Sequence, residues 1–308
     1  MSPERYRVVT VVALAMLIVI VVTGAAVRLT GSGLGCEDWP GCNDEKFVDV
    51  SSNHTAIEQV NRLFTGLVAL AVIAAVLGSL WRVPRRRDLT WLSLGLVAGV
   101  VGQVILGGIT VLVDLHPLAV QGHMLLSLVL VATAVVLVRR AGEPDDARQH
   151  VVASDAVRTL TWALATATAV AIVAGTVVTG AGPHAGDEDV QRFDVDISAA
   201  ARIHGTTVLI AVALAVVLAV CLQRSATDRQ LLQGPLSSWI FIALLQAAVG
   251  YVQYFNEVPA LLVGIHVAGA TVLWAMTVWL VLSTSAVAHA HAGLLANGPE
   301  RQYRAAST

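Results

Sequence analysis

Three histidines lie in long apolar segments of the sequence, at His123, His204 and His266. Each lies about six or seven residues into its segment, so a helical rise of about 1.5 Å per residue places all three roughly 9–10 Å from one end. A neutral imidazole is a good metal ligand, and two imidazoles on facing helices can hold one haem iron from its two sides. The three residues therefore predict haem ligation, with His204 and His266 as one axial pair.

Two other interpretations of these histidines stay open at this point. A lone histidine in a membrane helix can simply hydrogen-bond a neighbouring helix. A proton relay or a metal-transport site is the second alternative. It would need carboxylates close to the imidazoles, and the apolar segments after residue 158 contain none.

The elements that must position these residues are membrane-spanning helices. The 308 residues are 56% hydrophobic and 13% charged, with a mean hydropathy of +0.74. These values exclude a disordered chain and disfavour a soluble enzyme. Eight apolar runs are long enough to cross about 30 Å of hydrocarbon, which takes about 20 residues of helix. They cover residues 8–27, 57–80, 90–112, 117–138, 159–180, 198–222, 236–254 and 259–284.

The basic residues are distributed unequally between the two sides of such a bundle. One side carries Arg5, Arg7, Arg82, Arg85, Arg86, Arg87, Arg139, Arg140, Arg148, Arg158, Arg224, Arg229, Arg301 and Arg304. The other carries Arg28, Lys46 and Arg192. Basic loops stay in the cytoplasm, so we expect both termini there, in a multi-pass protein of a bacterial cell membrane surrounded by lipid. The net charge of −2 argues against a nucleic-acid partner.

An internal repeat divides the chain into two halves. The string VVTGA occurs at residues 21–25 and again at 177–181. Three residues recur 143 positions later, as the pairs Gln103 and Gln246, Gly107 and Gly250, and His123 and His266. We therefore predict two four-helix halves in the same orientation, as in parallel membrane repeats. The predicted parts are an N-terminal half at 1–140, a cytoplasmic linker at 141–157, a C-terminal half at 158–290 and a cytoplasmic tail at 291–308.

The two halves differ at the second ligand position, because the same offset places Asn61 where the other half has His204. An amide is a poor haem ligand compared with imidazole. Glu58 lies three residues earlier and so on the same helix face. His123 with a carboxylate and an amide across from it is the arrangement expected where chemistry happens at a bound porphyrin with one iron face open. The alternative for Glu58 is an interfacial carboxylate that the helix dipole favours.

Arginines and cysteines near the outer surface add further candidates. Arg28, Arg62 and Arg202 lie near the outer ends of their helices, where arginine ordinarily reaches to the interface. Binding of haem propionates is the sharper alternative, because a guanidinium binds carboxylates bidentately. Cys36 and Cys42 share the first outer loop, on the oxidising side, where they can form a disulfide. A two-cysteine metal site is the weaker alternative, because it lacks further ligands nearby.

Five segments in sequence order resemble the haem A synthase family. They are TGAAVRLTGSGLGCEDWPGC, GGITVLVDLHPLAVQGH, VVTGAGPHAGD, RIHG and VQYFNEVPALLVGIH, and they extend from about residue 20 to residue 275. The resemblance implies an all-α integral membrane fold with eight helices in two four-helix bundles. It also implies oxidation of the methyl group at pyrrole carbon 8 of haem O to a formyl group, which makes haem A for terminal oxidases.

The resemblance also implies roles for individual residues. His204 and His266 resemble the axial ligands of a haem b in the C-terminal half, and His123 resembles the ligand of the substrate haem iron. Glu58 resembles a glutamate thought to act in catalysis. Cys36 and Cys42 resemble the disulfide of the outer loop.

The sequence departs from the family at one position. Well-known members have E-x-x-H-R where this chain reads EQVNR, so Asn61 stands in place of a histidine. Either His123 alone suffices for the substrate iron, or another group completes its coordination.

The leading hypothesis is a haem A synthase in which haem b relays electrons, haem O binds at His123 and haem A is the product. Glu58 would position the substrate or move protons. Its expected partners are an electron donor of unknown identity and a haem O synthase, the farnesyltransferase that would hand over an insoluble substrate, and a homo-oligomer is compatible with the sequence. One alternative is a non-catalytic two-haem cytochrome, against which the asymmetry at Asn61 argues. A transporter or sensor with repeated halves is a third hypothesis, and it predicts no porphyrin.

Overall fold

The structure, a computed structural model, describes residues 1–145 and 148–288. Within these residues, the eight predicted spans are confirmed as eight helices that are long and apolar enough to cross a membrane. They are α1 (Pro3–Leu29), α2 (Asn53–Trp81), α3 (Arg87–Leu112), α4 (Pro117–Ala141), α5 (Asp155–Ala181), α6 (Ile197–Leu222), α7 (Ala226–Phe255) and α8 (Ala260–Leu282).

Several helices extend beyond the apolar runs that predict them. Helix α1 begins at Pro3 because the side chain of Ser2 caps its first turn, accepting a hydrogen bond from the Arg5 N–H at 3.4 Å. Helix α7 begins at Ala226, where Ser225 accepts from the Asp228 N–H at 3.2 Å. Such caps satisfy the free N–H groups of a helix end in water. Apolar character marks only the part of a helix that lies in lipid, so it underestimates the length of a capped helix.

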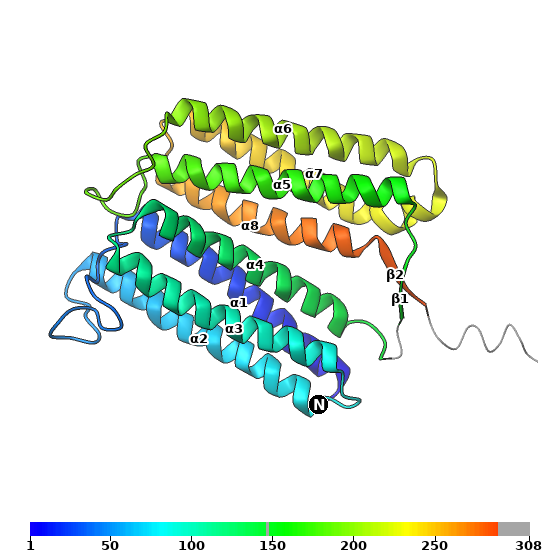
Figure 1. The fold of residues 1–308 in the computed structure, drawn as a ribbon, viewed down its shortest axis with the longest axis horizontal. Coiled ribbons are helices and arrows are strands. Elements are labelled where there is room, and N and C mark those ends of the chain that lie inside the picture. Colours follow the sequence, from blue (N-terminus) through cyan, green and yellow to red (C-terminus); the bar gives the residue numbers. More distant parts are fainter. Residues whose placement is uncertain (146–147, 289–308) are drawn as a thin grey trace, which may run out of the picture.

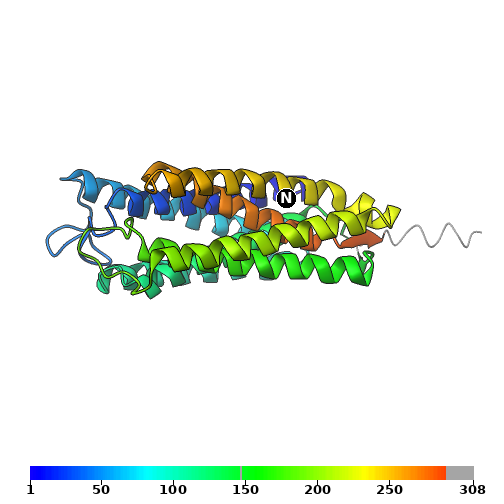
Figure 2. The same ribbon diagram turned by 90° about the horizontal axis from the view of Figure 1, so that it is seen from above.

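The helices pack as two neighbouring groups of four (Figure 1). In the first group α1 contacts α2 and α4, while α3 lies between α2 and α4. In the second group α5 contacts α6 and α8, while α7 lies between α6 and α8. Contacts of α8 with α1 and α4, and of α4 with α5, join the groups. Viewed from above, all eight helices run nearly parallel to one long axis (Figure 2).

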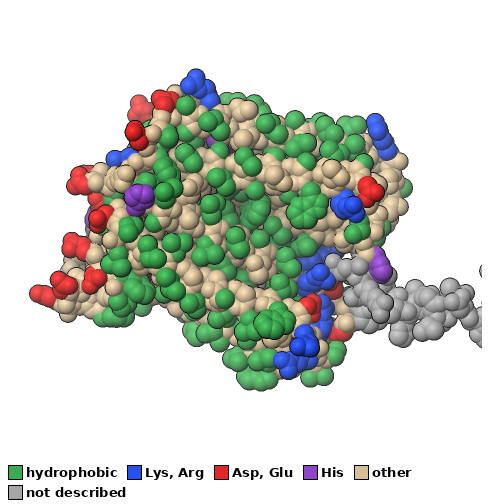
Figure 3. Space-filling model, in the orientation of Figure 1, with side chains coloured by type: hydrophobic (Ala, Val, Ile, Leu, Met, Phe, Trp, Pro, Cys, Tyr) green, Lys and Arg blue, Asp and Glu red, His purple; other side chains and the backbone are tan. Residues whose placement is uncertain are grey.

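The two ends of the bundle differ in structure and charge. The long loops 30–52 and 182–196 lie together at one end (Figure 1). Acidic side chains gather at that end, whereas most lysines and arginines on the visible face lie toward the opposite end (Figure 3). The N-terminus and the two strands also lie at this opposite end (Figure 1). Its cytoplasmic location stays a prediction.

A small sheet at the basic end was not predicted. Strand β1 (Arg148–Val151), in the predicted linker, pairs antiparallel with β2 (Ser285–Ala288) after α8, with Val151 opposite Ser285. Each strand has only four residues, which is too short for an alternating pattern to stand out in the sequence. The predicted cytoplasmic tail at 291–308 lies outside the described residues.

Candidate functional site

Two of the three predicted histidines meet in the second helix group. The imidazole rings of His204 on α6 and His266 on α8 have centroids 6.2 Å apart and planes at 78°. With metal–imidazole bonds of about 2 Å and ring centres about 1 Å behind the bonding nitrogens, two imidazoles on opposite sides of one iron have centroids roughly 6 Å apart. The donor set and its spacing therefore fit a haem iron held between these two side chains.

Neighbouring helices contact both imidazoles, and a hydrogen bond orients that of His204. Nδ1 of His204 is 2.8 Å from the carbonyl oxygen of Ala171 on α5. A proton on Nδ1 is donated to this oxygen, which leaves Nε2 free for a metal. A Cβ atom at Gly175 would lie only 3.1 Å from Cε1 of His204, and one at Gly250 would lie 3.6 Å from Cε1 of His266. An added side chain at Gly175 would displace the His204 ring, whereas a Cβ at Gly250 would be in ordinary van der Waals contact with the His266 ring.

The first helix group encloses a cavity of about 510 Å³. Helices α1 to α4 form its walls, and the first outer loop and the outer ends of α5 and α8 complete them. The lining includes five predicted site residues, namely Arg28, Glu58, Asn61, Arg62 and His123. The fold therefore brings the residues predicted for the substrate site together in one cavity. His204 and His266 do not line this cavity.

Several polar atoms of the residues that line this cavity are buried and have no hydrogen-bond partner among the described residues. They include Nδ1 of His123, Oδ1 of Asn61 and Oε1 of Gln103. Leaving such a group unpaired costs about 1–3 kcal/mol, so a bound water or polar ligand that paired with these atoms would be stabilising.

Gln103, which the sequence analysis did not assign to the site, supports the helix that carries His123. Its Nε2 donates to the backbone oxygen of His123 at 3.1 Å and to the Ser127 hydroxyl at 2.6 Å. The ring of His123 packs on Gly107, where a Cβ would lie 3.2 Å from Cε1. The signal that could have identified Gln103 was its recurrence with Gly107 and His123 in the second half.

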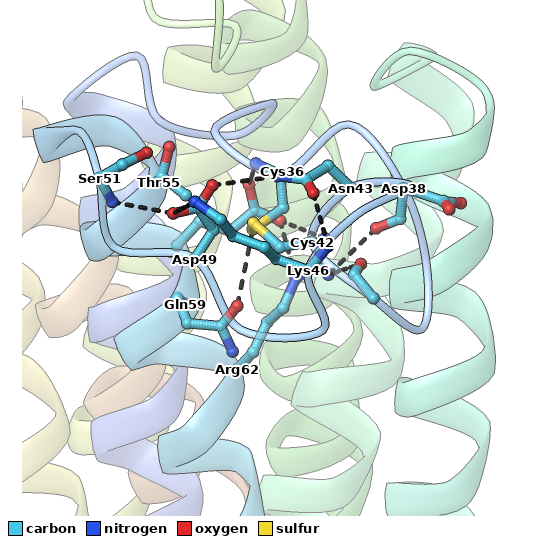
Figure 4. The surroundings of a disulfide bond; sticks show 12 residues. Cys36, Asp38, Cys42, Asn43, Lys46, Asp49, Ser51, Thr55, Gln59 and Arg62 are labelled. Carbon is cyan, nitrogen blue, oxygen red and sulfur yellow. Dashed lines mark hydrogen bonds and ion pairs between the residues drawn. A yellow bond between two sulfur atoms is a disulfide. The ribbon is translucent and has the colours of Figure 1, made fainter.

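The buried Glu58 and the partly buried Arg62 form an ion pair. Figure 4 shows Arg62 below the disulfide of the first outer loop. Oε1 of Glu58 accepts from Nε and Nη2 of Arg62 at 3.0 and 2.6 Å, and Oε2 accepts from the Cys36 N–H at 2.7 Å. Nη1 of Arg62 donates to the carbonyl oxygens of Asp38 and Gly41. Arg62 is therefore directed to protein acceptors, and a contact with propionates stays a prediction.

The other two arginines differ in their surroundings. Arg28 lines the cavity, donates from Nη2 to the Thr179 oxygen on α5 at 2.9 Å, and has a buried Nε without a partner among the described residues. Arg202 is exposed on the first turns of α6 and does not line the cavity. Arg28 is thus the better placed of the two to meet a ligand carboxylate.

The predicted disulfide between Cys36 and Cys42 is present, and both cysteines are buried. The loop that it closes carries Trp39, a lining residue that was not predicted as part of the site. The indole ring lies on Gly108 of α3, where an added Cβ would come within 2.6 Å of Cδ2. A loop residue packed on a distant helix has no periodic signal in the sequence, although the Gly-Gly at 107–108 marks a place of close approach.

This fold and site define a helical membrane protein with one paired-histidine site and one single-histidine cavity. A family model described as cytochrome oxidase assembly protein matches residues 7–54 and 46–278, and the chain belongs to this family.

Named relatives agree with the family. A protein named heme A synthase from Alkalihalophilus pseudofirmus is 28% identical over 151 residues, 49% of this chain and 50% of the relative. One from Bacillus pumilus is 30% identical over 135 residues, which are 42% of this chain and 43% of the relative. One from an Exiguobacterium species is 26% identical over 247 residues, which are 78% of this chain and 79% of the relative. The chain spans about half the length of the first two relatives. The apolar helices and bacterial relatives make it a multi-pass protein of the bacterial plasma membrane.

Proposed function

We propose that the protein is a haem A synthase, which oxidises the methyl group at carbon 8 of haem O to a formyl group and so makes haem A. The observation that carries this proposal is the difference between the two sites. The ring spacing of His204 and His266 fits a pair of haem ligands, whereas the cavity of the other half has His123 and, at the repeat position of the second histidine, Asn61.

The C-terminal site suits a resident haem b. His204 and His266 would both hold its iron, a donor set that suits electron transfer. When bound there, the haem b supplies electron-transfer chemistry. The residues of the chain hold and orient the ligands: the carbonyl oxygen of Ala171 sets the tautomer of His204, and Gly175 and Gly250 leave space for the rings.

The N-terminal cavity suits haem O as the substrate. His123 would bind its iron, and Gln103 holds the backbone of that helix turn. Arg28, at the outer part of the cavity, would meet the propionates. The apolar lower walls, with Leu17, Val68 and Leu130, exclude water from the reacting methyl group.

The arrangement of the helices in two groups supports separate functions for the two halves of the chain. We infer that residues 1–140 and 158–290 are parallel repeats, with the substrate site in the first and the haem b site in the second, and that both termini are cytoplasmic. The recurrence of Gly107 and His123 as Gly250 and His266, with each glycine packed on its imidazole, supports the repeat. A haem O synthase and a separate electron donor are the partners that this function requires.

A two-haem electron carrier is the second candidate. The observation that favours it is the well-formed histidine pair, which needs no substrate. It does not explain why the other half has Asn61 at the repeat position of His204, in a cavity that Glu58 and His123 also line, so we favour the synthase.

Complementation tests the proposal. The full-length protein is expressed in a bacterium that makes haem O but lacks its own haem A synthase. We expect a-type absorption of a terminal oxidase to return with the wild type and to be absent with His123→Ala. Membranes that contain the protein and haem O but no haem A would contradict the proposed function.

A further inference from the structure

The first outer loop forms the outer wall of the cavity. Trp39, Pro40 and Phe47 of this loop all line it. The indole ring of Trp39 rests on Gly108 of α3, so the loop that connects α1 to α2 also contacts the third helix of the group. The loop therefore covers part of the cavity at this end of the bundle.

Two charged side chains, Glu58 and Arg62, tie this loop to α2. Glu58 accepts a hydrogen bond from the N–H of Cys36, at the beginning of the disulfide loop. Arg62 donates to the carbonyl oxygens of Asp38 at 3.1 Å and Gly41 at 2.9 Å, on both sides of Trp39. The two side chains also bind each other, so they form one connected group between helix and loop.

This group is protected from water. The side chain of Glu58 is 7% exposed and that of Arg62 is 20% exposed. The disulfide closes the loop into one short ring, so contacts made at residues 36, 38 and 41 hold all of it together with Trp39. Both carboxylate oxygens of Glu58 are engaged by donors from the loop or from Arg62.

We propose that Glu58 and Arg62 are positioning residues, which latch the disulfide loop so that Trp39 closes the substrate cavity. Glu58 then acts through the loop and does not exchange protons with the substrate. This inference rests on the proposed function only in naming haem O as the substrate. The latch itself is a property of the protein without haem.

Hydrogen–deuterium exchange of the full-length protein in nanodiscs, without added haem, tests the latch. We expect Glu58→Ala and Arg62→Ala each to raise exchange across residues 36–47 by about tenfold or more, because each removes charge-assisted hydrogen bonds to the loop. The double variant should exchange no faster than either single variant. The control is Arg192→Ala, which removes a similar arginine-to-carbonyl bond, to Gly182, in the other outer loop. It should leave residues 36–47 protected.

Unchanged exchange of residues 36–47 in both single variants would overturn the latch, and so would independent, additive effects in the double variant. Haem A formation provides a separate measurement. For a latch, Glu58→Ala and Arg62→Ala should reduce it by similar factors. A much larger loss with Glu58→Ala, at equal loop exchange, would show that Glu58 acts on the substrate and would overturn the proposal.

A substitution outside the ion pair tests the role of Trp39. Gly108→Ala puts a methyl group where the indole lies, and we expect it to reduce haem A formation while the Cys36 N–H stays protected. The matched control is Gly95→Ala on the same helix, where an added Cβ meets nothing within 4 Å. Equal haem A formation by these two variants would contradict the closure by Trp39. If the wild type made no haem A, the proposed function would fail, and the exchange data would still decide the latch.

Discussion

The imidazoles of His204 and His266 are held differently, although they face each other. His204 donates from Nδ1 to a helix carbonyl, whereas Nδ1 of His266 has no partner among the described residues. A ligand whose second nitrogen donates to a carbonyl is fixed in orientation and is a stronger base. Both residues are needed for a haem with two axial imidazoles.

Replacement of either histidine by alanine should abolish the bound haem b. We expect His204→Ala and His266→Ala to lose the low-spin b-type absorption, measured as a reduced-minus-oxidised spectrum together with the haem content of the purified protein. The control is His54→Ala, because His54 is exposed at the start of α2 and bonds Ser32. A full low-spin spectrum in either alanine variant would refute the assignment.

Asn61→His tests the asymmetry between the two halves. Asn61 lines the cavity, and its Nδ2 lies 4.0 Å from the position of a Cβ added at Gly24, so the neighbouring helix leaves room there. We expect the variant to fold, to retain haem A formation within about tenfold, and to acquire an additional low-spin signal when loaded with haem. Absence of any spectral change would show that this side chain does not reach the iron.

For individual residues, the sequence predicted which histidines belong to the sites, but it did not predict the side chains and backbone groups that position the site residues. A histidine in an apolar run is conspicuous because it is costly in lipid. The partners of Glu58 and Arg62 are backbone groups of an irregular loop, whose path has no pattern in the sequence. The contact of Gln103 with the backbone of His123 is of the same kind.

Among the elements, the helices were predictable and the loops and strands were not. A helix in lipid must satisfy its own backbone, so each span needs a long apolar run that the sequence displays. The motif TGSGLGC contains information of another kind. Gly31 adopts a positive φ of 63°, and Gly35 packs against the backbone of His54 so closely that no side chain fits. The sequence alone does not show the close contact of Gly35 with α2, because it depends on how the loop packs on that helix.

The N-cap of α6 provides a prediction at this scale, because this helix carries His204. Asp196 accepts hydrogen bonds from the Ser198 hydroxyl and the Ala199 N–H, both at 2.6 Å, and these bonds hold its pKa below the ordinary value. The contribution of the cap is therefore complete above the unfolded pKa of about 3.9 and is lost as the pH falls through the lower folded pKa. We expect Asp196→Ala to lower the thermal midpoint slightly at pH 7, and Asp196→Ser to restore it. Equal midpoints of wild type and alanine variant at pH 7 would contradict this role.

In the whole molecule, a few polar contacts join the two helix groups. The indole N–H of Trp274 on α8 donates to the Leu128 oxygen on α4 at 2.9 Å, and Gln121 on α4 donates to the Thr176 hydroxyl on α5 at 2.8 Å. Most of the remaining interface is apolar packing. Such contacts fix the relative placement of the two sites and could not be predicted from an internal repeat.

Trp274→Phe tests the importance of this junction. The substitution keeps an aromatic ring but removes the indole donor and leaves the Leu128 oxygen without it. We expect a loss of about 1 kcal/mol in unfolding free energy, with both sites able to bind haem, measured by thermal unfolding in detergent. The control is Trp162→Phe, because Trp162 is 57% exposed on α5. An equally small effect at both positions would show that the hydrogen bond contributes little.

The most direct test of the account is chemical identification of the haems in the purified protein after co-expression with a haem O synthase. Haems are extracted, separated by chromatography and identified by mass. The account predicts haem B together with haem A or its hydroxylated precursor in the wild type, and haem B alone or with unaltered haem O in His123→Ala. Haem B with only unaltered haem O in the wild type, when an electron donor is supplied, would contradict the synthase activity.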